Sequence, residues 1–341
     1  MRKYTTISTS IHGHRKRVLI ESSSGKRQAI DLQRFAMLGK GNVINISSGV
    51  EKKIWCQNSE NKKDPILVSP GFASEGELKI GAYKVPLRFH EVISDAHLDD
   101  FKFLESFHYK TIDFQAQDHK KPLASKASGG RKAVIMCYAR FGKDWFPAAY
   151  IELQMPLMMC KPRHDLFAAP FKHPDRDVSW ITWNQSALKY VNTICRIARV
   201  VVHPEYRGLA ITKPLLSEAK TFAKERWHIA GARPLFMEIS AEMLNYIDFV
   251  SSSGFHFAGN TQGNLSRIFK DMGSMKKGKA SDFKEKYQIN TGIMSLQKKY
   301  HDQLEAFSQE IGATFDETLE RVKTIAESDN PREEMSPIEW F

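Results

Sequence analysis

The stretch from Arg199 to Leu216 holds the residues of this chain whose types and spacing best suit a phosphate group. Val200–Val202 are consecutive β-branched residues, which predict a strand buried on both faces. Arg207 and Gly208 follow in a short turn that leads into a helix with paired leucines. The first N–H groups of a helix lack intrahelical partners and lie at the positive end of its dipole. The pattern therefore suits a turn that binds a phosphate or a pyrophosphate, and the alternative is an ordinary strand-turn-helix, because glycine-containing turns begin many helices.

A carboxylate inside an apolar strand is the second candidate for chemistry. Glu238 lies within the run Pro234–Ser240, between apolar neighbours. Burying a charged carboxylate is unfavourable, so such a group often has a partner or a function. Two interpretations stay open: Glu238 is a general base, or it is a solvated or ion-paired structural residue. Glu242 is the second choice for a base.

The order of residues after Val202 resembles the acetyl-CoA-binding motif of the GNAT acyltransferase superfamily. That motif places a valine and a proline before Arg-Gly-x-Gly-x-Gly and a Leu-Leu helix. Arg207 and Gly208 match it, whereas Ala210 and Thr212 stand where the motif has its later glycines. The resemblance implies that the cofactor is acetyl-CoA or another acyl-CoA. The implied cofactor-binding residues are Val200, Val201, Val202, Arg207, Gly208, Leu209, Ala210, Ile211 and Thr212.

GNAT enzymes hold an amine against a thioester, and a base removes a proton from the attacking ammonium. The resemblance implies that Glu238 is that base and that a backbone N–H of the central strand donates a hydrogen bond to the thioester oxygen. Many GNAT enzymes protonate the departing thiolate with a tyrosine four residues before a Gly-Phe pair. Val250 stands at that position, and Tyr246, one helical turn earlier, is the candidate substitute, with a packing role as the alternative.

His108 and Tyr109 end the first predicted helix, and this pair resembles two related groups. One group is the phage Mom DNA-modification proteins, which convert adenine in DNA to a carbamoylmethyl form. The other is the GNAT domain fused to ABC-type ATPases, to which the run Glu238–Met243 is also similar. The Mom resemblance implies that His108 and Tyr109 lie in the active site, near an iron ion. Both are iron ligands, although two ligands do not complete a metal site; the alternative is that His108 interacts with the helix dipole.

The elements that must position these residues follow the order β-α-β-β-β-α-β-α-β between about residues 85 and 265, which is the GNAT order. We expect an α/β (α+β) protein with the GNAT fold, in which helices flank a mixed central sheet. The expected elements are a strand at 87–93, a helix capped by Asp95, a hairpin of strands 132–138 and 146–153, a central strand at 194–203, a helix to about 227, a strand at 234–240, a short helix at 243–252 and a last strand from 255.

Three domains are expected along the chain. Residues 1–75 form a basic and partly β N-terminal extension, and residues 76–265 form the acyl-CoA-binding GNAT domain. Residues 266–341 form a helical C-terminal extension with an acidic end. There the apolar spacing predicts one helix ending near Gly312, and Thr314 with Glu317 forms a capping box for the next.

The net charge of +11 is distributed unevenly. Residues 1–75 hold 13 Lys and Arg against 6 Asp and Glu, which gives +7, and residues 302–341 hold 3 against 11, which gives −8. A basic body favours nucleic acid, DNA or tRNA, as a partner, and a merely soluble surface is the alternative. The acidic helical end favours a protein partner or self-association.

We expect neither a secretory signal nor a membrane-spanning helix in this sequence. No apolar run approaches the length of a membrane helix, and no apolar segment follows the basic start. The four cysteines are scattered, which indicates reduced thiols rather than a disulfide scaffold. We therefore expect a cytoplasmic protein without a membrane partner.

These observations predict a GNAT-fold, acyl-CoA-dependent N-acyltransferase that acts on a nucleic acid or a nucleic-acid-linked substrate. Mom-like modification of adenine in phage-related DNA is the more specific version, and acetylation of aminoacyl-tRNA is another. The alternative from a different class is a GNAT-fold module that has lost catalysis and recognises nucleic acid or protein. Thr212 and the missing acid tyrosine at position 250 favour that alternative.

Overall fold

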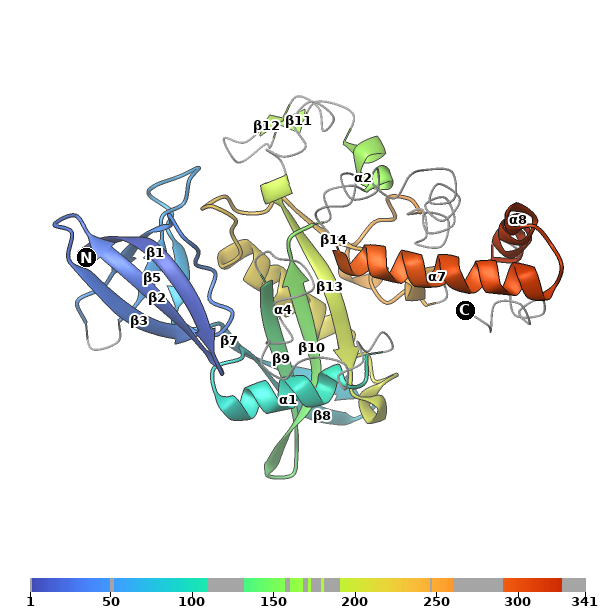
Figure 1. The fold of residues 1–341 in the computed structure, drawn as a ribbon. Coiled ribbons are helices and arrows are strands. Elements are labelled where there is room, and N and C mark those ends of the chain that lie inside the picture. The colour runs from blue at the N-terminus through green and yellow to red at the C-terminus, as the bar shows by residue number, and fades with distance from the viewer. Residues whose placement is uncertain are drawn as a thin grey trace. The chain divides into compact units, whose positions relative to one another are not determined.

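The computed structural model describes residues 2–49, 52–108, 132–156, 160–167, 171–172, 179–180, 191–245, 247–260 and 291–326. Backbone contacts divide the chain into two compact units, Met1–Gly259 and Asn260–Phe341 (Figure 1). The architecture is mixed α+β, with two six-stranded sheets in the first unit and helices in the second.

The first sheet is antiparallel and has the strand order β3-β2-β1-β4-β5-β6. Alternate residues of its strands point inward, as a half-buried sheet requires. Val18, Ile20, Ile44 and Ile66 are fully buried in its core. Its strands are β1 (Arg2–His12), β2 (Arg15–Ser22), β3 (Arg27–Gln33), β4 (Val43–Ile46), β5 (Ile54–Cys56) and β6 (Ile66–Ser69).

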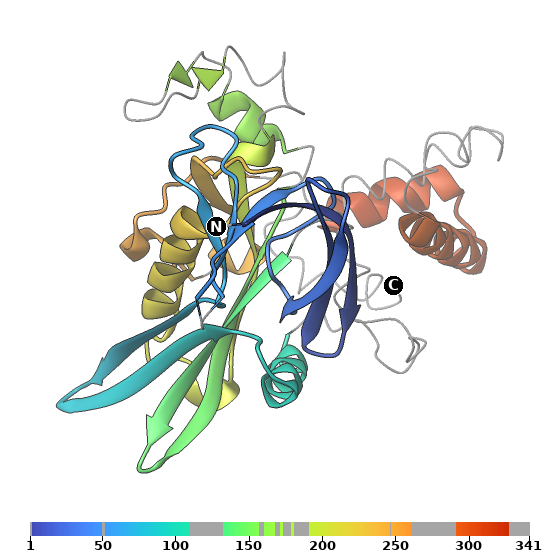
Figure 2. The same cartoon turned by 90° about the vertical axis from the view of Figure 1, so that its left-hand side faces the viewer.

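The second sheet has the order β14-β13-β10-β9-β8-β7, and only its β13–β14 pair is parallel. The expected hairpin at 132–153 is confirmed, with Gly142 in its turn at a φ of 63°. Figure 2 shows this hairpin in green and the β7–β8 hairpin in cyan. The strands are β7 (Ala73–Ile80), β8 (Tyr83–Glu91), β9 (Lys132–Phe141), β10 (Asp144–Gln154), β13 (Ile194–Val202) and β14 (Phe236–Ile239).

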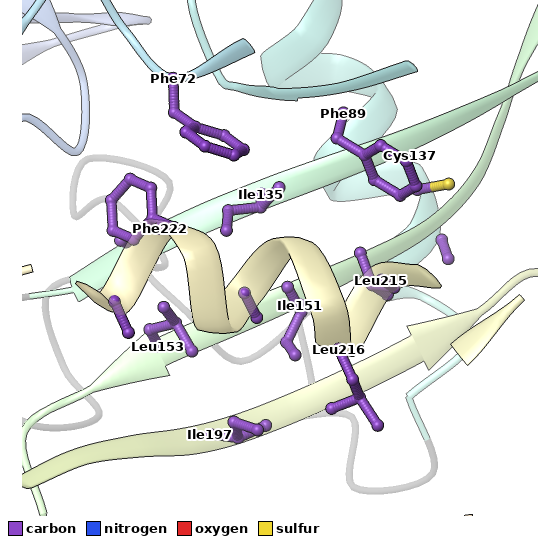
Figure 3. Close-up of a cluster of buried hydrophobic side chains, with 14 of the residues drawn as sticks. Phe72, Phe89, Ile135, Cys137, Ile151, Leu153, Ile197, Leu215, Leu216 and Phe222 are labelled. Atoms are coloured by element: carbon purple, nitrogen blue, oxygen red, sulfur yellow. The ribbon is translucent and has the colours of Figure 1, made fainter. Parts of the chain in front are cut away.

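Two helices cover the two faces of the second sheet. Helix α4 (Thr212–Glu225) packs its leucines and Phe222 on one face (Figure 3). Helix α1 (Asp95–Glu105) packs Phe101 and Leu104 on the other face. Strands β9 and β10 are apolar along most of their length because both of their faces are covered. Three short elements, α2 (Lys161–Leu166), β11 (Phe171–Lys172) and β12 (Ser179–Trp180), lie between β10 and β13 in the chain.

A buried carboxylate joins the two sheets. Glu91, at the end of β8, is 1% exposed and accepts hydrogen bonds from Gln33 Nε2 (3.2 Å) and the Phe72 N–H (2.8 Å). Burial raises the pKa of Glu91, and these donors with the charge of Arg226 oppose that rise. The N-terminal sheet is thus anchored to the second sheet through satisfied polar contacts.

The start of α1 differs from expectation. Ser94, rather than Asp95, caps the helix, because its backbone is extended and its hydroxyl accepts the His97 N–H (3.2 Å). The Asp95 carboxylate instead pairs with His14 Nδ1 of the first sheet (2.8 Å). Both residue types are good caps, so a tertiary contact decided between them.

The segment after β14 also differs from expectation. In place of one short helix, two 3₁₀ turns lie at Glu242–Asn245 and Ser251–Ser253, and residues 255–260 form no strand. The Asp248 carboxylate accepts the N–H groups of Val250 (3.0 Å) and Ser251 (2.9 Å), which competes with a continuous helix. The expected last strand is therefore wrong for the residues from 255 to 260.

The second unit contains helices α7 (Thr291–Glu310) and α8 (Phe315–Ala326). The predicted capping box is confirmed: the Thr314 N–H donates to Glu317 Oε2 (2.9 Å), and the Glu317 N–H donates to Thr314 Oγ1 (3.3 Å). Gly312 ends the first helix with a φ of 67°. No helix in the described parts of the chain is long and apolar enough to cross a membrane.

Candidate functional site

Strand β13 separates from β14 halfway along its length. The two strands pair only from Ile194 to Ile197, while β13 continues to Val202 beside β10. The register with β10 shifts at this point, since Ile197 lies opposite Leu153 and Arg199 lies opposite Glu152. This shift is a β-bulge, which bends and twists a strand. Among the described residues, Ala198–Val202 have no strand partner on the β14 side, and we call this opening the fork.

The turn after β13 presents free backbone donors. It follows His203 and the 3₁₀ turn Pro204–Tyr206, and it ends at Thr212, the first residue of α4. Gly208 and Ala210 are exposed and have φ values of 81° and 58°. Within the described part of the chain, no hydrogen bond is made by the N–H groups of Gly208, Ala210, Ile211 and Thr212. We call residues 207–212 the turn; its donors at a helix N-terminus can hold two or more phosphate oxygens.

The Arg207 side chain braces this turn. Its Nε donates to the Val202 carbonyl (3.2 Å), and one terminal nitrogen lies 3.5 Å from the Phe107 carbonyl. The guanidinium therefore connects the end of β13, the turn and the segment after α1. An arginine suits this position because the N–H donors of its planar guanidinium can reach two carbonyls at once.

His108 lies beside the same turn. Its N–H donates to the Glu105 carbonyl at the end of α1 (3.1 Å), and its neighbour Phe107 packs edge-on against the His203 ring at 4.8 Å. The structure thus brings the predicted His108 segment next to the predicted cofactor turn. Tyr109 lies outside the described residues, as does Tyr246.

The described residues give limited support for iron. They contain no group of three His, Cys, Asp or Glu side chains placed to hold a metal ion. His108 alone does not form a metal site. Iron therefore stays a prediction.

A buried group of charges lies under α1 at the fork, and sequence reasoning missed it. The Glu105 carboxylate pairs with Arg199 and accepts the hydrogen bond of the Tyr150 hydroxyl. The side chains of Glu105 and Arg199 are 9% and 17% exposed. Burial, followed by the charge of Glu152, raises the pKa of Tyr150, so this hydroxyl stays a donor.

A second ion pair continues this group along β10. Glu152 is fully buried, pairs with Lys132 of β9 and accepts from the Gln154 amide. The sequence carried a signal for it, because Glu152 interrupts the apolar strand 146–153. A buried ion pair stabilises a fold little compared with apolar residues.

Glu238 belongs to the same face of the sheet. Its Oε2 lies 3.3 Å from Arg163 Nε of α2, and Arg196 is directly opposite it in the β13–β14 register. Burial raises the pKa of Glu238, while the two arginines oppose that rise. Glu238 is thus ion-paired, and it lies in the paired half of the strands before the fork. Service as a base requires that its contact with Arg163 open.

The remaining candidates lie elsewhere. Glu242 is in the 3₁₀ turn after β14, and its side chain lies outside the described residues. Val250 is 7% exposed and packs in the core on the α4 side. This position therefore has no proton to give to a thiolate.

Comparison with protein-family models, with curated proteins and with solved structures found no match for this chain. Its function is therefore inferred from the fork, the turn and the buried charges on the α1 face.

Proposed function

We propose that this protein is a GNAT-fold, acyl-CoA-dependent N-acyltransferase. The observation that carries the proposal is the position of the fork directly before a turn in which four N–H groups have no partner among the described residues. The open edge of Ala198–Val202 suits an extended amide-containing arm, and the turn suits the pyrophosphate at the other end of that arm. The order of strands and helices from β8 to β14 agrees with this assignment.

The protein residues have separate roles in this proposal. When bound, acyl-CoA supplies the acyl group as a thioester. The N–H groups of Gly208, Ala210, Ile211 and Thr212 hold the phosphates, and Arg207 keeps their turn against β13. A backbone N–H of Val200–Val202 would donate a hydrogen bond to the thioester oxygen. Glu238 would take the proton that the acceptor amine loses as its nitrogen bonds to the acyl carbon, directly or through water, once it is free of Arg163. The carbon–sulfur bond of the thioester would break in the same reaction, and the CoA thiol would be the leaving group, with its proton taken from solvent.

The acceptor in this proposal is an amine on a nucleic acid or on a nucleic-acid-linked molecule. Support comes from the net charge of +11 and from the position of His108 beside the turn. Mom-like modification of adenine in DNA is the most specific form of the proposal. Mass spectrometry of nucleosides from cells that express the protein tests it, because a new adenine derivative is expected. Unmodified nucleosides contradict the Mom-like form. They do not bear on acyl-CoA binding, which is measured separately.

Isothermal titration with acetyl-CoA tests the cofactor. In the Gly208→Glu variant a carboxylate faces the free N–H groups, so we expect affinity to fall about tenfold or more. Gly41→Glu is the matched control, because both glycines have a φ above 80° and open space at the Cβ position. Absence of binding to the native protein, or equal losses in both variants, contradicts the proposal.

The second candidate function is a GNAT-fold module without catalysis. The ion pair between Glu238 and Arg163 and the buried Val250 favour it. Transfer of a labelled acetyl group to bulk nucleic acid or tRNA separates the two candidates. Nucleic-acid binding that depends on salt, without acetyl-CoA binding, favours the module.

A further inference from the structure

The end of α1 contacts both the fork and the turn that follows it. The Glu105 carboxylate, in the last turn of α1, pairs with Arg199 of the stretch Ala198–Val202. Two residues after Glu105, the Phe107 carbonyl oxygen lies 3.5 Å from a terminal nitrogen of Arg207 in the turn. The end of α1 and the two residues after it therefore touch both parts of the proposed site.

The fork strand lacks the support of a second neighbour. Among the described residues, Arg199–Val202 pair with β10 on one side and with no strand on the other. The β-bulge after Ile197 also interrupts the regular pairing with β10 at the start of this stretch. A strand with one interrupted ladder opens more easily than a strand with a regular ladder on each side. Side-chain contacts therefore have to fix its position.

Arg199 provides a directional contact for this stretch. Val200 and Val202 pack against the apolar core on the α4 side, and Val201 belongs to the apolar cluster under α1. Apolar burial is non-directional, whereas the hydrogen bonds of an arginine–carboxylate pair depend on geometry. The contact with Glu105 therefore restricts the position of the strand more narrowly than the valines do.

Tyr150 holds the Glu105 carboxylate in place. Its hydroxyl donates to that carboxylate from β10, where Tyr150 lies opposite Val201 in the strand register. The side chains of Glu105 and Arg199 are largely buried, so water competes little for this contact. Three elements, α1, β10 and β13, therefore meet at one carboxylate.

We infer that Glu105 is a positioning residue for the ligand that spans the fork and the turn. Through Arg199 it fixes the backbone of the fork strand, and the residues that follow Glu105 bring the same helix end to the turn. An extended arm bound at both places needs a constant separation between their N–H groups, because hydrogen bonds weaken steeply once their geometry departs from the optimum. The identity of this ligand as acyl-CoA rests on the proposed function, whereas the positioning of the strand does not.

Hydrogen exchange of β13 in the free protein tests the positioning without a ligand. Glu105→Gln keeps the size of the side chain and leaves the buried Arg199 charge without its counter-charge, so Arg199 should leave its position. We compare the N–H groups of Arg199–Val202 that bond to β10 with those of Ile194–Ile197 in the same strand. The ratio of their exchange rates should rise about tenfold or more in the variant. A ratio removes the effect of a change in global stability.

Glu152→Gln is the matched control, because it also removes the carboxylate of a buried ion pair on the α1 face. Its partner Lys132 lies on β9, which is on the side of β10 away from β13. We expect this variant to lose stability while the exchange ratio within β13 changes less than about twofold. An equal rise of the ratio in both variants overturns the inference, as does a ratio that Glu105→Gln leaves unchanged.

Isothermal titration with acetyl-CoA measures the consequence for binding. Glu105→Gln should weaken the affinity about tenfold or more, and Glu152→Gln should change it less than about threefold. Replacing Glu105 and Arg199 together by Met removes both buried charges, so the free energy of unfolding should recover. The affinity should stay about tenfold low in this double variant, because the directional contact is gone. Affinity that recovers along with stability assigns Glu105 a purely structural role and overturns the inference.

The outcomes separate this inference from the proposed function. A native protein that does not bind acetyl-CoA contradicts the proposed function, and the exchange ratio then decides the inference by itself. A native protein and a Glu105→Gln variant that bind acetyl-CoA with equal affinity contradict the inference alone.

Discussion

Each face of the second sheet is covered by a helix, but the ion pairs buried beside the fork, Glu105 with Arg199 and Glu152 with Lys132, lie on the α1 face. On the α4 face, Ile135, Ile151, Leu216 and Phe222 pack against one another, as Figure 3 shows. On the α1 face, apolar residues such as Val134 and Met136 lie near the carboxylates and cations of Glu105, Arg199, Glu152 and Lys132. Of these charged residues, Glu105 lies in α1, Lys132 in β9, Glu152 in β10 and Arg199 in β13.

This difference separates the part of the sheet that stabilises the fold from the part suited to chemistry. Apolar burial stabilises a protein in proportion to the area removed from water. A buried ion pair recovers little more than the free energy lost by removing both charges from water. We therefore expect the α4 face to contribute more to the stability of the fold than the α1 face.

The largest expected effect is on the α4 face. Phe222→Ala should lower the free energy of unfolding by about 3–5 kcal/mol, because the ring is 1% exposed and packs edge-on against Phe72 at 5.6 Å. Urea denaturation measures this loss, and Tyr83→Ala at an exposed ring should change it by less than about 0.5 kcal/mol. A loss below 1 kcal/mol for Phe222→Ala would mean that this face is not the stabilising one.

The next effect is on the α1 face. Glu152→Gln should lower the free energy of unfolding by about 3 kcal/mol, because it leaves the buried Lys132 ammonium without its counter-charge. Adding Lys132→Met should restore most of the stability, since an apolar residue needs no partner. Glu21→Gln, which breaks the exposed pair with Arg27, should change it by less than about 1 kcal/mol. Failure of the second substitution to restore stability would show that packing, not charge, sets the effect.

A substitution at Ala210 tests the backbone conformation of the turn at residues 207–212. Its φ of 58° disfavours any side chain with a Cβ atom, so Ala210→Gly should raise the stability by about 1 kcal/mol. Ala219→Gly in the buried part of α4 should have the opposite sign, because glycine weakens a helix interior. Thermal unfolding measures both changes. Destabilisation by Ala210→Gly would contradict the left-handed conformation of the turn.

The smallest expected effect is a pH dependence on the α1 face. Burial raises the folded-state pKa of Glu238 above its ordinary value of 4.5. The folded protein then binds more protons than the unfolded chain in the window that begins near pH 4.5 and extends to the raised pKa. The Glu238 contribution to stability is therefore present below this window and is lost as pH rises through it.

Urea denaturation of the native protein and of Glu238→Gln at several pH values measures this contribution. The native protein should lose stability relative to the variant as pH rises from 4 to about 7. A native protein that gains stability relative to the variant over this range would show that Arg163 and Arg196 dominate over burial at Glu238.

Sequence reasoning succeeded where neighbours in the chain decide the structure. The Thr314–Glu317 capping box and the β9–β10 hairpin around Gly142 depend on residues a few positions apart. Sequence reasoning was wrong where a contact with a residue distant in the chain decided the structure. Asp95 was expected to cap α1, but His14 of the first sheet pairs with it, and Ser94 is the cap.

The candidate site divides in the same way. The strand, turn and helix around Arg207 could be read from composition and spacing. Glu105 gave no such signal, because its ion pair with Arg199 depends on how α1 lies over β13. Glu152 did give one, since a carboxylate interrupts an apolar strand, but its partner Lys132 follows only from the β9–β10 register.

The sequence by itself determined the alternation of strands and helices, the uneven charge and the turn at residues 207–212. Each of these depends on local backbone preferences or on composition. The tertiary structure alone decided the fork and the partners of Glu238 and Glu105. These features join residues from separate elements, and the free energy that places them comes from strand register and helix packing, which no short stretch of chain contains.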